Sequence, residues 1–115
     1  MLLENLKWPD VKRIDFSQTA VVIPLGSVEQ HGPHLPLTTD TEIVTAVAQE
    51  VESRLSDRIL VTPTLWLGHS PHHMNFAGTL SVEPRVYIDI GQIAGALDGS
   101  SRSKEVVSPQ RTRWE

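Results

Sequence analysis

The segment PLGSVEQHGPHLPLTTD (residues 24–40) places a glutamate, two histidines and an aspartate among prolines and glycines. Glu29 and His31 are two positions apart, so in an extended backbone both side chains leave the same face. Asp40 follows later, and the intervening prolines stiffen the turn that returns it towards the pair. Two carboxylates and an imidazole form a donor set that suits zinc, manganese or ferrous iron. The residue types alone allow either a metal site or a solvated, hydrogen-bonded loop.

A second segment, GHSPHHMNFAGTLS (residues 68–81), holds three further histidines, His69, His72 and His73. These side chains could be metal ligands, substrate contacts or solvated residues, and the sequence leaves the three possibilities open. His34, in the first segment, follows a proline and could serve only to hydrogen-bond its own loop.

Each of these segments follows a run with the character of a buried strand. Residues 19–26 and 58–68 are apolar, rich in β-branched side chains and closed by glycine. Between them, residues 41–55 carry apolar side chains at helical spacing. Strand, helix and strand at this length predict a parallel unit, and in parallel sheets ligands collect at the carboxyl ends of the strands. We therefore expect both histidine-bearing loops to lie at the same edge.

Helix boundaries can be predicted from capping residues. Thr39 with Glu42 matches a capping box, which starts the first helix at about Asp40. Ser81 is a candidate cap for a second helix over residues 82–97, with Pro84 in its first turn.

Composition limits the classes of function. A chain of 115 residues is one domain or less, and a net charge of −4 argues against a nucleic-acid-binding surface. No cysteine is present, so neither a disulfide framework nor a thiolate nucleophile is available. No apolar run has the length of a signal peptide core or a membrane span, which predicts a cytoplasmic protein with a small-molecule or protein partner.

The composition changes at residue 98. Residues 1–97 carry six Lys and Arg against eleven Asp and Glu, whereas residues 98–115 carry four against three. The second stretch is polar, basic and without periodicity, so we expect a disordered tail after one α/β unit over residues 1–97.

Taken whole, residues 24–40 resemble the signature of the creatininase (creatinine amidohydrolase) family, P-L-G-S-x-E-Q-H-G-P-H-L-P-L-x-T-D. Residues 68–81 are similar to the family's second segment, G-x-S-x-x-H-x-x-F-P-G-T-x-S, with Ala77 in the place of its proline. The similarity extends from about Leu3 to about Leu97.

The resemblance implies a three-layer α/β/α fold with a mainly parallel sheet, here truncated, in a homo-oligomer. It implies two divalent metal ions, zinc or manganese with iron as an alternative, and a metal-activated water that hydrolyses a C–N bond in a cyclic or linear amide. Matched by position, Glu29 would bind one metal, His31 the other, and Asp40 would bridge them. His73 falls on the family's histidine near the active site, so the resemblance makes it the catalytic candidate.

Family members are about twice this length, and their second half supplies a further histidine, in an N-G-H-G-G-N-like segment, and a further acidic ligand. The resemblance therefore implies impaired activity for this chain. An alternative is a non-catalytic fragment or subunit that needs a partner chain. A change of substrate is a third possibility, since related enzymes include a peptidase that trims a redox-cofactor precursor and a formamide hydrolase.

Back-translation of residues 98–115 into their possible codons suggests an origin for this stretch. Shifting their degenerate codons by one nucleotide permits M-E-A-A-G-R-K-K-L-F-L-L-N-A-H-G-G-N, which contains the family's missing histidine segment. Our hypothesis is that a frameshift replaced the second half. Sequencing the locus tests it, because an intact frame with no family-like sequence in another frame would reject it.

Overall fold

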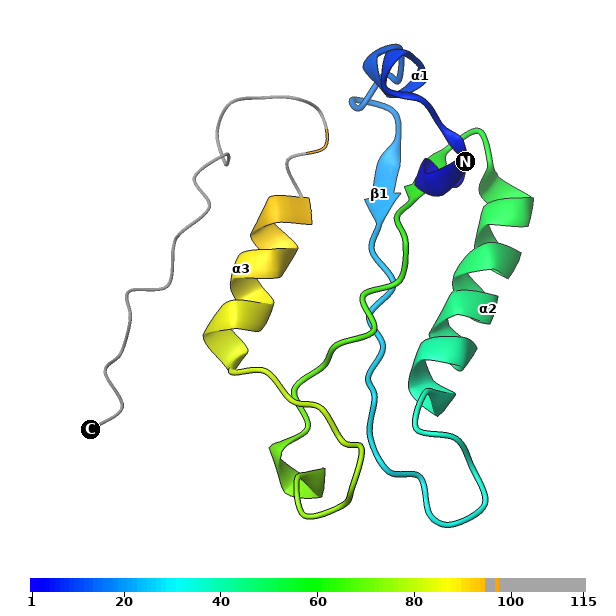
Figure 1. Cartoon of the computed structure of the whole chain (residues 1–115). Coiled ribbons are helices and arrows are strands. Elements are labelled where there is room, and N and C mark those ends of the chain that lie inside the picture. The colour runs from blue at the N-terminus through cyan, green and yellow to red at the C-terminus, as the bar shows by residue number, and fades with distance from the viewer. Residues whose placement is uncertain (95–96, 98–115) are drawn as a thin grey trace.

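The computed structural model describes residues 1–94 and 97, and the predicted tail at 98–115 lies outside the described residues. The described elements run along the chain in the order shown in Figure 1: η1 (Leu3–Asn5), α1 (Trp8–Lys12), β1 (Ala20–Val22), α2 (Thr39–Leu55), β2 (Ile59–Val61), η2 (Pro71–His73) and α3 (Pro84–Ala94).

The two strands are parallel neighbours, as the sequence predicts. Ala20 pairs with Ile59 and Val22 with Val61. A further parallel bridge joins Leu25 to Leu65. Two residues separate Val22 from Leu25 and three separate Val61 from Leu65, so the second segment has one extra residue between the two paired positions. Both strands are much shorter than the predicted runs at 19–26 and 58–68. Prolines interrupt both segments beyond Val22 and Val61, and a proline cannot donate a hydrogen bond to the ladder.

Helix α2 connects the strands and begins at Thr39, close to the predicted start. The predicted capping box of Thr39 with Glu42 is wrong. The hydroxyl of Thr39 donates instead to the carbonyl of Pro36 at 2.6 Å, while Glu42 accepts from the hydroxyl of Thr38 at 3.3 Å. The helix starts one residue early, which places Thr39 inside the first turn, where it cannot act as a cap.

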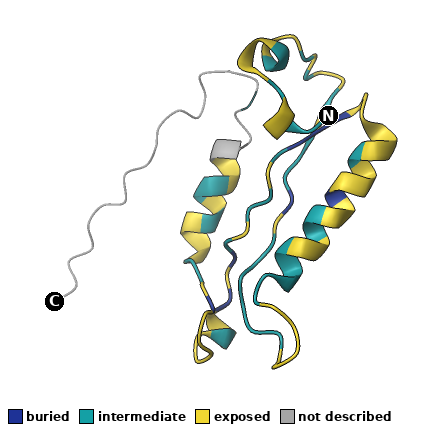
Figure 2. Cartoon of the chain, turned by 45° about the vertical axis from the view of Figure 1, so that its right-hand side comes forward, coloured by how far each residue is buried: buried dark blue, intermediate teal, exposed yellow. Residues whose placement is uncertain are grey.

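The buried apolar core of the described residues is small and centres on β2. Ile59, Leu60 and Val61 are all buried, Leu60 completely, and Ala48 of α2 packs against Ile59 and Val61. The remaining apolar side chains of α2 do not reach this core. Ile43 and Val47 are 58% and 57% exposed, and Figure 2 shows that most of the α2 surface is open. One apolar stripe of α2 is thus uncovered in this chain.

Helix α3 lies on the opposite side of the strand pair from α2 in both views (Figures 1 and 2). Helices on the two sides of a parallel sheet agree with the predicted α/β/α architecture. The predicted start of α3 is wrong, since it begins at Pro84 and not directly after Ser81. The hydroxyl of Ser81 accepts a hydrogen bond from the backbone N–H of Ser70 at 2.8 Å, so it joins the second loop and caps no helix. In the described part of the chain, every helix is too short or too polar to cross a membrane.

Gly26 marks the place where the first loop passes closest to α2. A Cβ built at Gly26 would lie 2.6 Å from the Thr41 hydroxyl oxygen and 2.7 Å from the Thr41 Cα. Both distances are shorter than van der Waals contact, and a backbone atom cannot rotate out of the way.

We predict that Gly26→Ala destabilises the fold by about 1–3 kcal/mol, the usual cost of overpacking, as measured by urea unfolding. Gly91→Ala is the matched control. Gly91 lies in α3 with nothing within 4 Å of its built Cβ, so the alanine should stabilise the chain by about 0.5–1 kcal/mol through helix propensity. Equal stability of Gly26→Ala and wild type would contradict the close approach.

Candidate metal centre

The two histidine-bearing loops lie side by side at the carboxyl ends of the strands, as the parallel pairing predicts. Their backbones are directly hydrogen-bonded, because the N–H of Leu80 donates to the carbonyl of Val28 at 2.9 Å. The N–H of Gln30 donates to the hydroxyl of Thr79 at 3.3 Å, and Thr79 is buried. These contacts fix the first loop against the second.

Three predicted ligands converge on this edge. One ligand atom from each of Glu29, His31 and Asp40 lies within 4.8 Å of the other two. All three side chains are half-buried, which limits competing water while leaving access from solvent. Residues that are widely spaced along the loop are therefore brought together by its return to α2, where Asp40 sits in the first turn.

The orientation of His31 follows from its hydrogen bonds. Its Nδ1 lies 3.0 Å from the backbone carbonyl of Glu29, and a carbonyl only accepts, so Nδ1 carries the proton. The neutral ring then presents an unprotonated Nε2, which lies 3.3 Å from Oδ1 of Asp40. The hydrogen bond to the Glu29 carbonyl is the main reason that the pKa of His31 is raised; burial opposes the increase, and the Asp40 carboxylate adds to it. Such an orientation is typical of a histidine that binds metal through Nε2.

Asp40 is held by a residue that the sequence analysis did not single out. The Ser27 hydroxyl donates to Oδ2 of Asp40 at 2.6 Å, and this bond is the main reason that the pKa of Asp40 lies below its ordinary value. Desolvation opposes the shift, while His31 adds to it. The Ser27 carbonyl in turn accepts from the hydroxyl of Thr41 at 2.8 Å. The available signal for this role was a serine directly after Gly26, the glycine that closes the predicted strand run.

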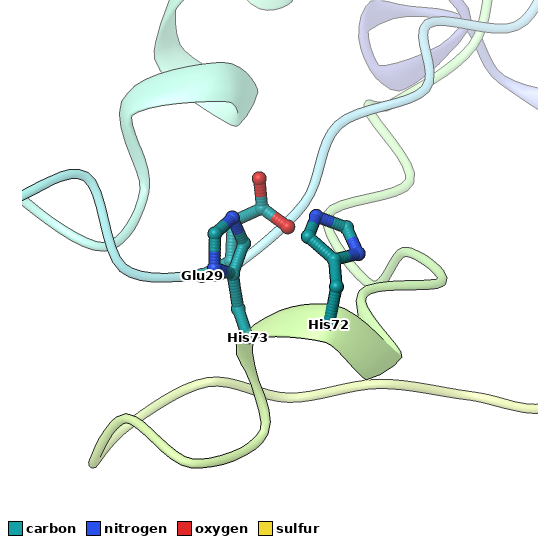
Figure 3. Close-up of side chains that lie close together, drawn as sticks. All are labelled: Glu29, His72 and His73. Atoms are coloured by element: carbon teal, nitrogen blue, oxygen red, sulfur yellow. The ribbon is translucent and has the colours of Figure 1, made fainter.

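A second cluster shares Glu29. Ligand atoms of Glu29, His72 and His73 also lie within 4.8 Å of one another, and Figure 3 shows both rings turned towards the carboxylate. The two rings are inclined to each other by 50°, with centroids 4.1 Å apart. His69 turns away, because its Nδ1 donates to the carbonyl of Val82 at 2.7 Å. Neither metal-ligand group found among the described residues includes His34, which is exposed.

The residues present fit a divalent metal ion. Carboxylate oxygens and imidazole nitrogens suit zinc and manganese, and the ring of His31 already presents its free nitrogen to the other ligands. Ligand atoms of a tetrahedral zinc site are about 3.3–3.6 Å apart, given bonds of about 2.0–2.2 Å. Separations up to 4.8 Å thus require only small side-chain rotations.

Comparisons with known proteins place this geometry in context. Residues 4–96 match the model of the family described as Creatininase: Creatinine amidohydrolase. A mycofactocin precursor peptide peptidase of Mycobacterium tuberculosis is 51% identical over 71 residues, and a creatinine amidohydrolase of Pseudomonas putida is 30% identical over 85 residues. The alignments cover 55% and 69% of this chain.

Solved structures of creatininases have the same fold. A manganese creatininase superimposes with a TM-score of 0.71, and a mutant creatininase of Zn-Zn type with 0.70; both are 28% identical and cover 80% of this chain. The chain spans only part of these proteins, 37% of each solved creatininase and 28% of the peptidase.

We predict that Ser27→Ala raises the pKa of Asp40 towards its ordinary value, because it removes the largest cause of the lowering. A carboxyl NMR titration of the metal-free chain measures this directly. Ser17→Ala is the control, since the Ser17 hydroxyl and N–H lower the pKa of Asp15 in the same way. It should raise the pKa of Asp15 and leave Asp40 unchanged. An unaltered Asp40 titration in Ser27→Ala would show that the hydroxyl does not control this carboxylate.

Without metal, Asp40 and His31 should make the stability of the fold depend on pH, Asp40 on the acidic side and His31 on the alkaline side. The pKa of Asp40 is lowered by folding, so its contribution exists above the ordinary carboxyl pKa and is lost as pH falls through the lowered value. The pKa of His31 is raised, so its contribution exists below the ordinary imidazole pKa and is lost as pH rises through the raised value. Urea midpoints measured in chelator should therefore decline on the alkaline side in wild type and stay level there in His31→Ala. A similar alkaline decline in both chains would assign it to another group.

Proposed function

The chain belongs to the creatininase family, and from this membership we propose that it carries a metal-binding part of a hydrolase that cleaves C–N bonds. One observation carries the proposal: Glu29, His31 and Asp40 bring their ligand atoms within 4.8 Å of one another at the carboxyl edge of the sheet. These are the residues that the family signature marks as ligands. The conclusion therefore rests on matching residue types and on their convergence in space.

Each side chain has a distinct part in this proposal. Glu29 would hold one divalent ion, zinc or manganese, His31 would hold a second through Nε2, and Asp40 would be shared by the two. The two carboxylate oxygens of Asp40 already face different partners, since Oδ2 accepts from Ser27 while Oδ1 faces His31. The bound ions would polarise the scissile carbonyl and supply a water that ionises near neutral pH. The protein's part is to hold its ligands in place before the metal arrives.

A peptide is the substrate class that we favour. The M. tuberculosis peptidase is 51% identical in the aligned region, whereas the P. putida creatinine amidohydrolase is 30% identical. The site edge is also open beside His73, where Phe76 is about half exposed, which leaves room for an extended substrate. The cleaved bond would be a C–N bond of a linear amide.

A second candidate is a subunit that acts only with a partner chain. It is favoured by the uncovered apolar stripe of α2, which consists of Ile43, Val47, Val51 and Leu55. Exposed apolar surface of this kind is costly in water and marks interaction sites. Because the aligned relatives are much longer, we propose that the partner carries the remaining part of the creatininase fold.

We predict that the purified chain takes up zinc or manganese and that Asp40→Ala or His31→Ala weakens the binding by about 100-fold or more. Loss of an outer-shell partner alone costs 10- to 100-fold in typical sites, so loss of a ligand should cost at least as much. Equilibrium dialysis followed by elemental analysis gives the affinity and the number of ions per chain.

His34→Ala serves as the control, because it removes an exposed histidine of the same loop from outside the ligand group. Metal uptake that is insensitive to Asp40→Ala would reject the assigned site. Hydrolysis of short peptides by the metal-loaded chain would support the enzyme on its own. Metal uptake without hydrolysis would favour the partner-dependent subunit if hydrolysis appears when a second chain with the remaining part of the fold is added.

A further inference from the structure

The side chain of Gln30 connects the two loops of the site. Its Oε1 accepts from the backbone N–H of Gly32 at 2.9 Å, and its Nε2 lies 3.0 Å from Nδ1 of His73. Its own N–H donates to the buried Thr79 hydroxyl. Gln30 is thus anchored at both ends between the loops, next to two of the proposed ligands.

These contacts determine which nitrogen of His73 carries the proton. A backbone N–H can only donate, so the amide oxygen of Gln30 must face Gly32 and its NH₂ group must face His73. Gly32 has φ of +72°, a conformation that glycine adopts without strain, so this turn fits the residue there. An NH₂ group also only donates, so Nδ1 of His73 accepts and the proton of the neutral ring resides on Nε2.

We propose that Gln30 is a positioning residue that holds His73 in the Nε2–H tautomer, so that His73 donates a hydrogen bond to an oxygen atom of the substrate. The acceptor would be a carbonyl or carboxylate oxygen of a peptide beside Glu29. The role in substrate binding rests on the proposed function, whereas the tautomer rests on the hydrogen bonds alone.

The same argument counts against the Glu29, His72 and His73 cluster as a further metal site as long as Gln30 keeps its contact with His73. A metal on Nε2 of His73 would require a proton on Nδ1, and the amide NH₂ of Gln30 cannot accept it. A metal on Nδ1 would displace Gln30 from its contact. None of the ion pairs among the described residues joins Glu29 to either ring, although one ligand atom of each of the three residues lies within 4.8 Å of the others.

His73 is also held in place by its surroundings. Its backbone N–H donates to the carbonyl of Ser70 at 3.1 Å within η2, and its ring meets Phe76 edge-on with centroids 6.0 Å apart. The ring of His72 also lies close to it, with centroids 4.1 Å apart. A ring held by these contacts presents its Nε2–H in a constant direction, which is what a hydrogen-bond donor to substrate needs.

The test is the tautomer of each histidine, read from ring ¹⁵N chemical shifts of the full chain at about pH 9 in chelator, where imidazoles are neutral. His73 should be the Nε2–H form, while His31 and His69 should be the opposite form because their Nδ1 atoms face carbonyls. Gln30→Glu keeps an acceptor for Gly32 but replaces the NH₂ group with an acceptor. It should therefore change the tautomer ratio of His73 by about tenfold or more towards Nδ1–H.

Gln49→Glu is the matched control, since it adds the same charge at an exposed position of α2 and should leave all tautomers unchanged. An Nδ1–H form of His73 in wild type, or an unchanged ratio in Gln30→Glu, would overturn the proposal. Dialysis against zinc adds a second readout, because His73→Ala should bind as much metal as wild type and reduced stoichiometry would make His73 a ligand. If zinc binds to neither the wild type nor the variants, the proposed function is rejected, whereas the tautomer result is unaffected.

Discussion

The parallel pairing of β1 and β2 is the constraint on which the candidate site depends. Because both strands run in the same direction, the loops that follow them emerge at the same edge. The hydrogen bond between Leu80 and Val28 then ties the second loop to the first. An antiparallel pair would place the loops at opposite ends of the sheet and separate Glu29 from the histidines of the second loop. A few backbone hydrogen bonds thus decide which side chains can act together.

At this edge of the sheet, the side chains of the candidate site are oriented by hydrogen bonds to groups that can only donate or only accept. The Glu29 carbonyl turns the free nitrogen of His31 towards Asp40, and the Ser27 hydroxyl fixes the other oxygen of that carboxylate. Gln30 performs the corresponding task for His73. The proposed ligands are therefore oriented before any metal binds, which would reduce the entropy cost of forming the site.

Outside the candidate site, the described part of the chain has a small core and much exposed apolar surface. The apolar core is centred on a three-residue strand, and much of the apolar surface of α2 is uncovered. The site edge is nevertheless well connected, since polar contacts there join residues far apart in the sequence. A fold that spans about a third of its structural relatives can thus position ligands without enclosing a substrate.

The sequence by itself determined the parallel α/β arrangement and the identity of the convergent residues. Apolar runs ending in glycine predicted the strands, and the signature around Glu29, His31 and Asp40 predicted which side chains would meet. These features are local in sequence, or are set by the strand directions, so patterns of residue type reveal them. The predicted caps at Thr39 and Ser81 failed because each hydroxyl found a different partner nearby in space.

Only the tertiary structure decided how those residues are oriented. The roles of Ser27 and Gln30 depend on partners 13 and 43 positions away in the sequence, and no local pattern records such contacts. Residue types alone left the three histidines of the second loop equivalent, and the family resemblance singled out His73. The fold then separated their hydrogen bonds: His69 donates to a backbone carbonyl, whereas His73 accepts from Gln30. Residue types limit what a side chain can donate or accept, but the neighbours that folding brings within about 3 Å decide which of these possibilities is used.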